Sequence, residues 1–257
     1  MVDFMKKEKP PYSIAAKYYD ELIPKNRGQS IRDLHSFLHG LWDFSDLLPR
    51  CLDVGCGTGG IFRYWDCSHL DPLSHGIDPS SEMIALARSN CPQIYFEEVD
   101  LLEFNSINKF DWIVSTGNAV NYIVPDDRRK FFEKAADLLA PTGLLYFDFD
   151  TRRDIEEFWP GQIRIEKRSS FRFEAEYTYD IKRDVGVEKQ YWSETKNKKD
   201  IFYETHHIYP ISPAEIVRDL KETKFKDPIF CHPEDYKFVS DGADFLVLGC
   251  IVRLLNG

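Results

Sequence analysis

No apolar run in this sequence approaches the roughly 20 residues that a membrane-spanning helix needs. The start of the chain also lacks the apolar region of a signal peptide, and neither internal repeats nor low-complexity segments are present. We therefore expect a globular protein of the cytoplasm with no membrane partner. Its 257 residues suggest one to two domains, and a hydrophobic content of 43% can fill a sizeable core.

Cysteine pairs are missing as well. The six cysteines are scattered and include no C-x-x-C pair, so the sequence indicates neither a disulfide framework nor a zinc or other metal site. Cys51 and Cys250 lie in apolar runs, which predicts that both thiols are buried in the core.

Positive charge is scarce. Thirty-three basic residues stand against 43 acidic residues, and the net charge of −10 would repel a phosphate backbone at long range. The main basic cluster, Lys196–Lys199, is typical of a solvated hairpin turn. We expect no nucleic-acid partner, and the choice between a monomer and a homodimer stays open.

The sequence does contain a glycine-rich turn directly after a short apolar run. Residues 50–60, followed by Ile61–Trp65, predict a strand, a turn and a helix N-terminus. Glycines let the backbone of such a turn touch a nucleotide-type cofactor. Gly55, Gly57 and Gly60 also satisfy the G-x-G-x-x-G spacing of dinucleotide enzymes. Asp53 separates the two classes, because its carboxylate would repel a pyrophosphate and attract a cationic group.

The run Leu52–Gly59 resembles the first motif of class I methyltransferases that use S-adenosylmethionine. That cofactor carries an ammonium and a sulfonium but no phosphate, which agrees with an acid at the strand end. The resemblance implies that Asp53, Gly55, Cys56 and Gly57 contact the cofactor. It extends over nearly the whole chain to small-molecule N-methyltransferases of the amino-sugar type, including those that act on nucleotide-linked amino sugars.

A second acid, Asp78, ends a predicted strand about 20 residues beyond the glycines, where this architecture places a carboxylate on the ribose hydroxyls. The alternative is that Asp78 only caps the helix that follows. The resemblance also implies that Pro79 and Met83, at the start of that helix, lie near the adenosine.

A third acid, Asp100, follows the predicted strand 93–99. In the family that this chain resembles, an acid at this place accepts a hydrogen bond from the adenine amine. The next apolar residue, Leu101, would then lie against the adenine ring. The alternative is a simple turn aspartate.

The predicted strand 110–115 ends in Ser115 and continues into Thr116–Tyr122. Ligands of such sheets lie beyond the carboxyl ends of the strands, so Ser115 should border the cofactor and Asn118 is a candidate catalytic residue. Methyltransferases of nucleic-acid bases or glutamine side chains usually carry Asp/Asn-Pro-Pro-Tyr/Phe here. This chain does not, which disfavours those acceptors.

Residues up to about Pro11 mix charge with proline and should be loosely held. Tyr12–Pro24 reads as a short helix, and it resembles the Ala-x-x-Tyr-Asp-x-Leu pattern with which small-molecule methyltransferases begin. There, one tyrosine faces the reaction centre, which makes Tyr18 a catalytic candidate. Packing against the sheet is the alternative. Arg27 is either a solvated loop residue or a partner of the cofactor carboxylate.

Between residues 154 and 210 the apolar pattern changes to a period of two, which predicts an antiparallel sheet laid over the substrate side of the core. In its last strand, one face should present Tyr203, Thr205, His207 and Tyr209, and the other Phe202, Glu204, His206 and Ile208. The apolar segment 245–252 predicts a buried closing strand.

These patterns predict an α/β fold: a Rossmann-like, mostly parallel sheet of seven strands with helices on both faces and an inserted antiparallel sheet over the active site. We divide the chain into an N-terminal cap and cofactor-binding core (residues 1–153), the insertion (154–210) and the C-terminal part of the core (211–257).

Methyl transfer is an in-line displacement on a sulfonium carbon, so the protein contributes mostly alignment and exclusion of water. An amine must be neutral to attack, and a hydroxyl must lose its proton. Histidine, with an unperturbed pKa of about 6.5, can accept either proton. His206 and His207 are the candidate bases, although a strand histidine is more often a packed or surface residue.

We therefore predict an S-adenosylmethionine-dependent methyltransferase of a small soluble metabolite, with an amine acceptor favoured over a hydroxyl. One alternative is a non-catalytic regulatory protein that binds the same cofactor, which the intact Asp53, Asp78 and Asp100 argue against. Another is a methyltransferase with a peptide or protein acceptor. A third, an NAD-linked oxidoreductase, is hard to reconcile with Asp53.

Overall fold

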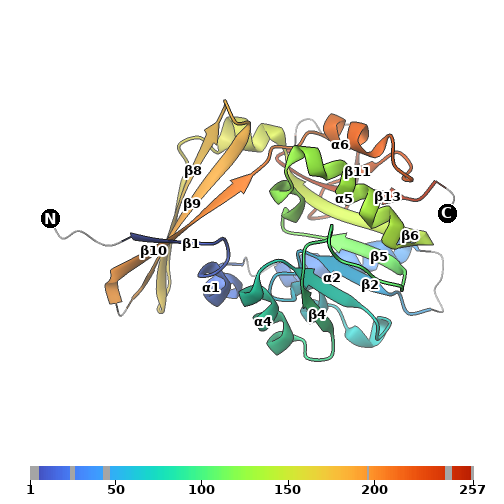
Figure 1. The fold of residues 1–257 in the computed structure, drawn as a ribbon, viewed down its shortest axis with the longest axis horizontal. Helices are drawn as coiled ribbons and strands as arrows, with labels where there is room; N and C mark the ends of the chain where they lie inside the picture. The colour runs from blue at the N-terminus through green and yellow to red at the C-terminus, as the bar shows by residue number, and fades with distance from the viewer. Residues whose placement is uncertain (1–5, 24–26, 43–46, 196, 241–244, 256–257) are drawn as a thin grey trace.

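Two β-sheets with helices around them make up the protein (Figure 1). The computed structural model describes residues 6–23, 27–42, 47–195, 197–240 and 245–255. The larger sheet and its helices hold most of the N-terminal half and the C-terminal end of the chain. The smaller sheet stands beside it, with helix α1 (Ala15–Leu22) between the two.

The larger sheet has eight strands in the order β12-β11-β13-β6-β5-β2-β3-β4. Its parallel half consists of β2 (Cys51–Val54), β3 (His75–Asp78), β4 (Tyr95–Glu98), β5 (Phe110–Ser115) and β6 (Leu139–Asp150). At the other edge, successive neighbours are antiparallel: β13 (Val247–Arg253), β11 (Ile229–Cys231) and β12 (Phe238–Val239). The mostly parallel α/β sheet is confirmed, and its eighth strand is the two-residue β12.

Helices cover both faces of this sheet because its central strands are apolar on both sides. One face packs against α2 (Arg27–Leu41), α3 (Gly60–Tyr64) and α4 (Ser81–Asn90). The other face packs against α5 (Pro125–Leu138) and α6 (Pro213–Leu220). Cys51 and Cys250 are fully buried, one in each of the two resulting core clusters.

The smaller sheet has the order β1-β10-β9-β8-β7. Its strands are β7 (Ile163–Lys167), β8 (Phe171–Asp180), β9 (Val185–Glu194), β10 (Asn197–Ile208) and β1 (Lys6–Lys9). All pairs are antiparallel except β1 with β10, which are parallel. For Lys6–Lys9 the expectation of a loosely held segment is wrong, because these residues pair with β10, whereas residues 1–5 lie outside the described residues. The division at residues 154 and 210 remains a prediction.

Two further expectations can be compared with the structure. Arg27 is the first residue of α2 and not part of a loop. Within the predicted hairpin turn, Lys196 lies outside the described residues, and the chain from Asn197 belongs to β10. The short helical turns are η1 (Cys67–His69), η2 (Ala119–Tyr122) and the π-helical η3 (Asp154–Phe158).

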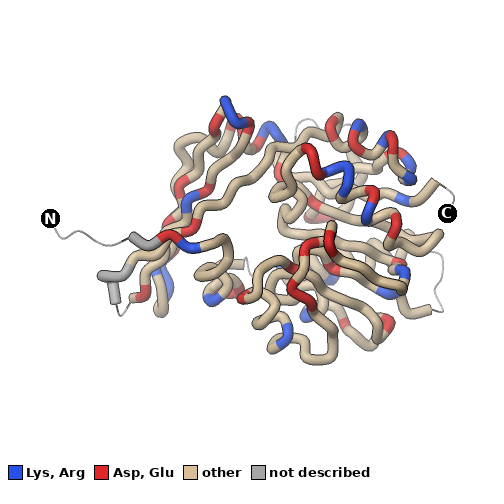
Figure 2. The backbone as a smooth tube through the Cα atoms, in the orientation of Figure 1, with Lys and Arg blue, Asp and Glu red and all other residues tan. Residues whose placement is uncertain are grey.

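Ion pairs join the two sheets. Arg152, just after β6, donates to Asp184 in the β8–β9 turn at 2.8 Å and to Glu215 of α6 at 3.1 Å. Arg128 of α5 is fully buried and donates to Asp219 of α6 at 2.8 Å. Figure 2 shows charges of both signs along α5 and α6.

Among the residues that the structure describes, no helix is long and apolar enough to cross a membrane.

Candidate functional site

A cavity of about 580 Å³ lies beyond the carboxyl ends of β2, β3 and β5, and the glycine turn after β2 forms part of its wall. Gly55, Gly57 and Gly59 have φ angles of 71°, 52° and 81°, a backbone region that side chains disfavour. A Cβ atom on Gly55 would also stand only 2.8 Å from the Ala119 side chain. The glycines are therefore needed for the shape of the turn as well as for access to it.

Asp78, at the end of β3, holds this turn in place. One carboxylate oxygen accepts a hydrogen bond from Gly57 N at 2.9 Å, and the other accepts one from Ser80 N at 2.8 Å. Burial raises the pKa of Asp78 above its ordinary value, and these two hydrogen bonds oppose the shift. The cap of α4 is Ser80, whose hydroxyl accepts from Met83 N. Asp78 is thus left to line the cavity.

Asp53, at the end of β2, is 1% exposed, and neither carboxylate oxygen has a hydrogen-bond partner among the described residues. Burial, followed by the charge of Asp78, raises the pKa of Asp53 to about 8, while Arg27 opposes the shift. A buried carboxylate is unfavourable unless a cation or a hydrogen-bond donor compensates for the water it has lost. An ammonium group would meet this need and a pyrophosphate would worsen it.

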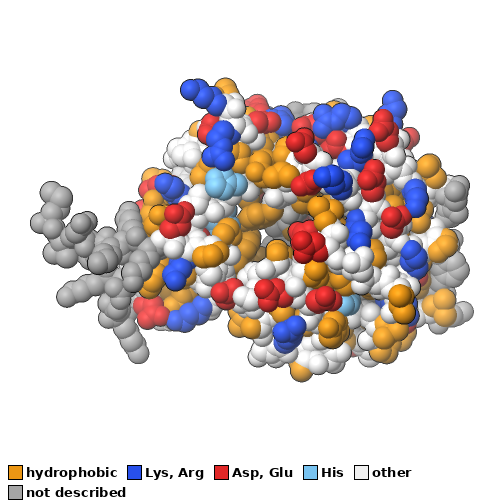
Figure 3. Space-filling model, in the orientation of Figure 1, with side chains coloured by type: hydrophobic (Ala, Val, Ile, Leu, Met, Phe, Trp, Pro, Cys, Tyr) orange, Lys and Arg blue, Asp and Glu red, His pale blue; other side chains and the backbone are white. Residues whose placement is uncertain are grey.

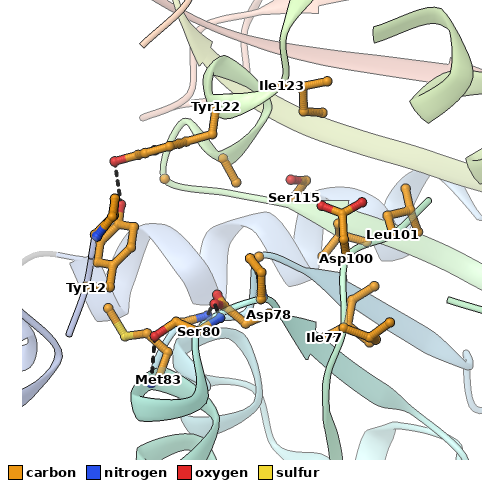
Figure 4. Close-up of a pocket in the computed structure, with 18 of the residues that line it drawn as sticks. Tyr12, Ile77, Asp78, Ser80, Met83, Asp100, Leu101, Ser115, Tyr122 and Ile123 are labelled. Atoms are coloured by element: carbon orange, nitrogen blue, oxygen red, sulfur yellow. Dashed lines mark hydrogen bonds between the residues drawn. The ribbon is translucent and has the colours of Figure 1, made fainter. Parts of the chain in front are cut away.

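The remaining predicted cofactor residues lie along the crevice (Figure 4). Asp100 and Leu101 line one end, Tyr12 and Tyr122 the other, and Met83 lies near Tyr12. Asp100 also accepts from Leu102 N at 2.8 Å, so it is a turn aspartate that faces the cavity as well. Pro79 and Ser115 complete the wall, and the Ser115 hydroxyl is buried without a partner in the described part of the chain.

Cys56 is separate from this group. Its side chain is 6% exposed and belongs to the apolar cluster around α2, α3 and α4, and the residue does not line the crevice. Its small size allows the turn to pack close to Gly76, where an added Cβ atom would stand 3.2 Å from the Cys56 sulfur. Burial raises the pKa of the Cys56 thiol well above its ordinary value, which makes the thiol unreactive.

A second cavity, of about 700 Å³, opens between the larger and the smaller sheet. It shares Tyr12, Tyr19, Gly117 and Tyr122 with the first cavity, so these residues form a common wall. Figure 3 shows the molecule hollowed between its two parts, with hydrophobic side chains around the hollow. The aromatic residues that line the second cavity include Phe158, Trp159, Phe173, Tyr177 and Trp192.

Three carboxylates also face the second cavity, from Asp150, Asp154 and Glu188. Burial and the neighbouring carboxylates, Asp154 first, raise the pKa of Asp150 well above its ordinary value. Asn118, which has a φ angle of 61°, donates from its amide to Asp150 at 2.8 Å and from its backbone to Asp148 at 2.7 Å. Asn118 therefore orients the acids at the boundary between the two cavities.

The two candidate histidines lie on opposite faces of β10. His206 is fully buried, with Nδ1 at 2.9 Å from the Tyr122 hydroxyl and Nε2 at 3.3 Å from Glu204. The Tyr122 hydroxyl is 2.7 Å from the Tyr12 hydroxyl. His206 is thus linked to the walls of both cavities by these two tyrosines. His207 is half-buried and lines neither of the two cavities described here.

Tyr18 lies outside both cavities. Its ring stacks on Trp192 at a centroid distance of 5.7 Å, and its hydroxyl donates to Glu194. The tyrosine of α1 on the common wall is Tyr19. A signal was available in the sequence, because in the Ala-x-x-Tyr-Asp-x-Leu pattern the tyrosine directly before the aspartate is Tyr19.

Arg27 is a further residue beside the crevice. Its guanidinium donates to Thr116 at 3.4 Å and passes within 3.3 Å of the place that a Cβ atom on Gly117 would take. Its charge lowers the pKa of Asp53 and of Asp148, against the effect of burial. No group of acids, histidines and cysteines in the described ranges is arranged to hold a metal ion.

Comparison with known proteins agrees with this geometry. Residues 51–143 match a family model described as "Methyltransferase domain". A Geobacillus protein named as a methyltransferase is 31% identical over 119 residues, which cover 44% of this chain and 47% of that protein. The phosphoethanolamine N-methyltransferase of Plasmodium falciparum is 35% identical over 101 residues, 37% of each chain. The chain thus spans about half the length, or less, of these two relatives.

Solved structures resemble nearly the whole chain. An S-adenosylmethionine-dependent methyltransferase from Clostridium acetobutylicum has a TM-score of 0.76 at 18% identity, over 94% of this chain and 96% of that one. A sugar N-methyltransferase from Streptoalloteichus has a TM-score of 0.72 at 14% identity, over 92% of both chains. At such identities the likeness establishes the fold, including the smaller sheet.

Proposed function

We propose that this protein is an enzyme that methylates the nitrogen of a small soluble amine. The chain carries a methyltransferase domain and has the fold of S-adenosylmethionine-dependent methyltransferases. The observation that supports this proposal best is the common wall of Tyr12, Tyr19, Gly117 and Tyr122. It joins a crevice suited to the cofactor to a separate cavity suited to an acceptor. Methyl transfer requires the two reactants to lie side by side, and the shared residues show that the two cavities are adjacent.

The cofactor is S-adenosylmethionine, which supplies an electrophilic methyl group on a sulfonium when bound. The orphaned Asp53 carboxylate would hold its ammonium, and Arg27 would hold its carboxylate. Asp78 would accept from the ribose hydroxyls, and Asp100 with Leu101 would hold the adenine. These roles suit the chemistry of the cofactor, because it offers a cation and hydroxyl groups to the carboxylates of the crevice and carries no phosphate.

The second cavity, which we assign to the methyl acceptor, favours an amine over a neutral alcohol. Asp150, Asp154 and Glu188 face it, and the arginine on its wall is Arg164, which also contacts Glu166. Carboxylates and aromatic rings together attract a cationic group. The neighbour named as a sugar N-methyltransferase and the relative named for phosphoethanolamine are both consistent with an amine acceptor. A peptide acceptor and a purely regulatory role are weaker alternatives, because neither needs a second cavity lined by carboxylates beside the first.

Transfer of a labelled methyl group tests the proposal. The protein is incubated with tritiated S-adenosylmethionine and, separately, D-glucosamine, ethanolamine, benzylamine, a metabolite extract, or the alcohols that correspond to the three amines. We expect label in amines and little in alcohols. Asp150→Asn should lower the amine rate by about 10-fold or more, since a buried charge partner is lost. Glu174→Gln, at a half-buried β8 residue that pairs with Arg172 and lines neither cavity, is the control that should keep the rate.

Label found only in alcohols would reject the amine. Tight cofactor binding with no transfer to any acceptor, including the extract, would favour the regulatory alternative.

A further inference from the structure

We propose that Tyr12, Tyr122, His206 and Glu204 form a proton path that carries the proton of the acceptor ammonium away from the transfer site. The inference rests on the proposed amine methylation. It assigns the base to a buried histidine that has no direct contact with either cavity and acts through two tyrosines on the common wall.

The four groups form an unbroken series of hydrogen bonds. Tyr12 Oη is 2.7 Å from Tyr122 Oη, which is 2.9 Å from His206 Nδ1. His206 Nε2 is 3.3 Å from Glu204 Oε2. Because a carboxylate only accepts, Nε2 carries the hydrogen and donates to Glu204, which leaves Nδ1 as an acceptor. Tyr122 then donates to His206 and Tyr12 donates to Tyr122, so a Tyr12 lone pair faces the acceptor.

Glu204 is fixed as a permanent acceptor. It is fully buried, and its carboxylate accepts from the backbone N–H groups of Tyr12 and Ala15, both at 3.1 Å, and of Ile14. These three donors fix the position of the carboxylate next to the imidazole. Glu204 thus sets the tautomer of His206 and would stabilise the imidazolium, as a carboxylate behind a catalytic histidine does.

Other ionisable groups surround His206 on each packed element. Glu188 of β9 is its cross-strand partner on the same face, Tyr122 approaches from η2, and Tyr12 approaches from the segment before α1 with a ring distance of 5.0 Å. Of the two carboxylates, Glu204 on the same strand is the one in contact with the imidazole, and the other two groups are phenols. His206 is therefore the hydrogen-bond acceptor at the buried end of the tyrosine series.

The tyrosines pass the proton without keeping it. Burial raises the pKa of Tyr12 and of Tyr122 well above the ordinary value of a phenol, so neither is a phenolate at neutral pH. When the N–H bond of the acceptor breaks, its proton bonds to Tyr12 Oη, the Tyr12 proton moves to Tyr122, and the Tyr122 proton moves to His206 Nδ1. The nitrogen keeps the electron pair that attacks the methyl group. After product release the proton returns to water by the reverse route.

The pH dependence of single-turnover methyl transfer tests the path, with the amine that the labelling experiment identifies. Tyr122→Phe keeps the ring on the wall and removes the connecting hydroxyl. We expect about a 100-fold loss at pH 7, in line with general-base contributions. The loss should shrink towards pH 9.5, where water deprotonates the free amine. A loss of the same factor at every pH would indicate a structural role and overturn the path.

Matched variants complete the test. Tyr12→Phe should reproduce the Tyr122→Phe profile, whereas Tyr203→Phe, on the opposite face of β10 with its hydroxyl on Glu8, should keep wild-type rates. Calorimetric affinity for S-adenosylhomocysteine should change less than about threefold in all three variants, since each variant keeps the aromatic ring and loses only a hydroxyl. If Asp150→Asn and not Tyr122→Phe shows the pH-dependent loss, the base is Asp150 and the path is rejected.

A spectroscopic readout works even without an acceptor. In ¹⁵N-histidine-labelled protein with S-adenosylhomocysteine, His206 should show a protonated Nε2 and a hydrogen-bonded, unprotonated Nδ1, and Tyr122→Phe should shift Nδ1 selectively. A hydrogen on Nδ1 would overturn the path, because the series would then point towards the cavity. Absence of label transfer would instead overturn the proposed function, so the two failures are distinguishable.

Discussion

At the scale of single residues, the crevice contains an unfavourable electrostatic interaction between Asp53 and Asp78. Asp53 is buried, has no hydrogen-bond partner among the described residues and is close enough to Asp78 for their charges to interact. Its pKa is raised from 3.8 to about 8. Between these values the unfolded chain has lost the proton and the folded chain keeps it, so stability falls as the pH rises through this window.

The first prediction follows from this sign. Binding of S-adenosylmethionine at pH 7 should release up to about one proton, because its ammonium lowers the pKa of Asp53. Asp53→Asn should abolish the release, weaken binding by about 10-fold or more and flatten the fall in melting temperature between pH 5 and 8. Calorimetry in buffers of different ionisation enthalpy measures the proton count. An equal proton count in Asp53→Asn would refute the assignment.

At the scale of elements, α1 bridges the two sheets. Near its start, Glu204 of β10 accepts from backbone N–H groups that the helix itself leaves unpaired, and the N-cap Ile14 has no side-chain cap of its own. Nearer its end, Asp20 accepts from Thr58 at 2.7 Å and from Arg63 at 2.6 Å. The helix therefore places Tyr19 between the glycine turn and the smaller sheet.

Glu204→Ala should loosen this bridge. Losing a charged acceptor at a helix start costs about 1–2 kcal/mol, so amide exchange in residues 12–22 should accelerate by roughly 5- to 30-fold. Hydrogen exchange measured by mass spectrometry checks this, with Glu174→Ala in β8 as the control. Cofactor affinity should fall in parallel because Tyr12 and Tyr19 lose their support. Unchanged exchange in this segment would show that α1 is held by its apolar packing alone.

At the scale of the whole molecule, the two cavities are built by segments that are far apart in the chain. The ion pairs of Arg152 and the packing of α1 connect the two sheets, so we expect them to unfold together. S-adenosylhomocysteine at 100 times its Kd should stabilise the protein by about 2.7 kcal/mol. For a chain of this length that is a rise of roughly 5–10 °C in Tm.

Scanning calorimetry checks this third prediction, and NAD at the same concentration is the control. NAD should leave Tm unchanged, because Asp53 would face its pyrophosphate. Stabilisation by NAD would point to the oxidoreductase alternative. Two separate transitions, of which only one shifts, would contradict the expected coupling of the two sheets.

Some features were predictable because they depend on near neighbours in the sequence. The glycine turn after β2 and the acids that end β3 and follow β4 appear as local spacing, and parallel strands bring such ends to one edge. The alternation in β10 correctly separated His206 from His207 as opposite faces, since side chains of a strand alternate. The edge strand of the larger sheet was harder to predict, because a strand of two residues such as β12 is too short to give a periodic pattern in the sequence.

The sequence by itself determined the class of fold and the acidic, glycine-lined crevice, because both depend on strand periodicity and on a backbone turn that only glycine adopts easily. Only the tertiary structure decided which aromatic residues meet there. Tyr12, Tyr122 and His206 are separated by as many as 194 residues, and their hydrogen bonds exist because β10 packs against the start of α1 and against η2. Such contacts depend on how the sheets pack, which no local pattern in the chain records.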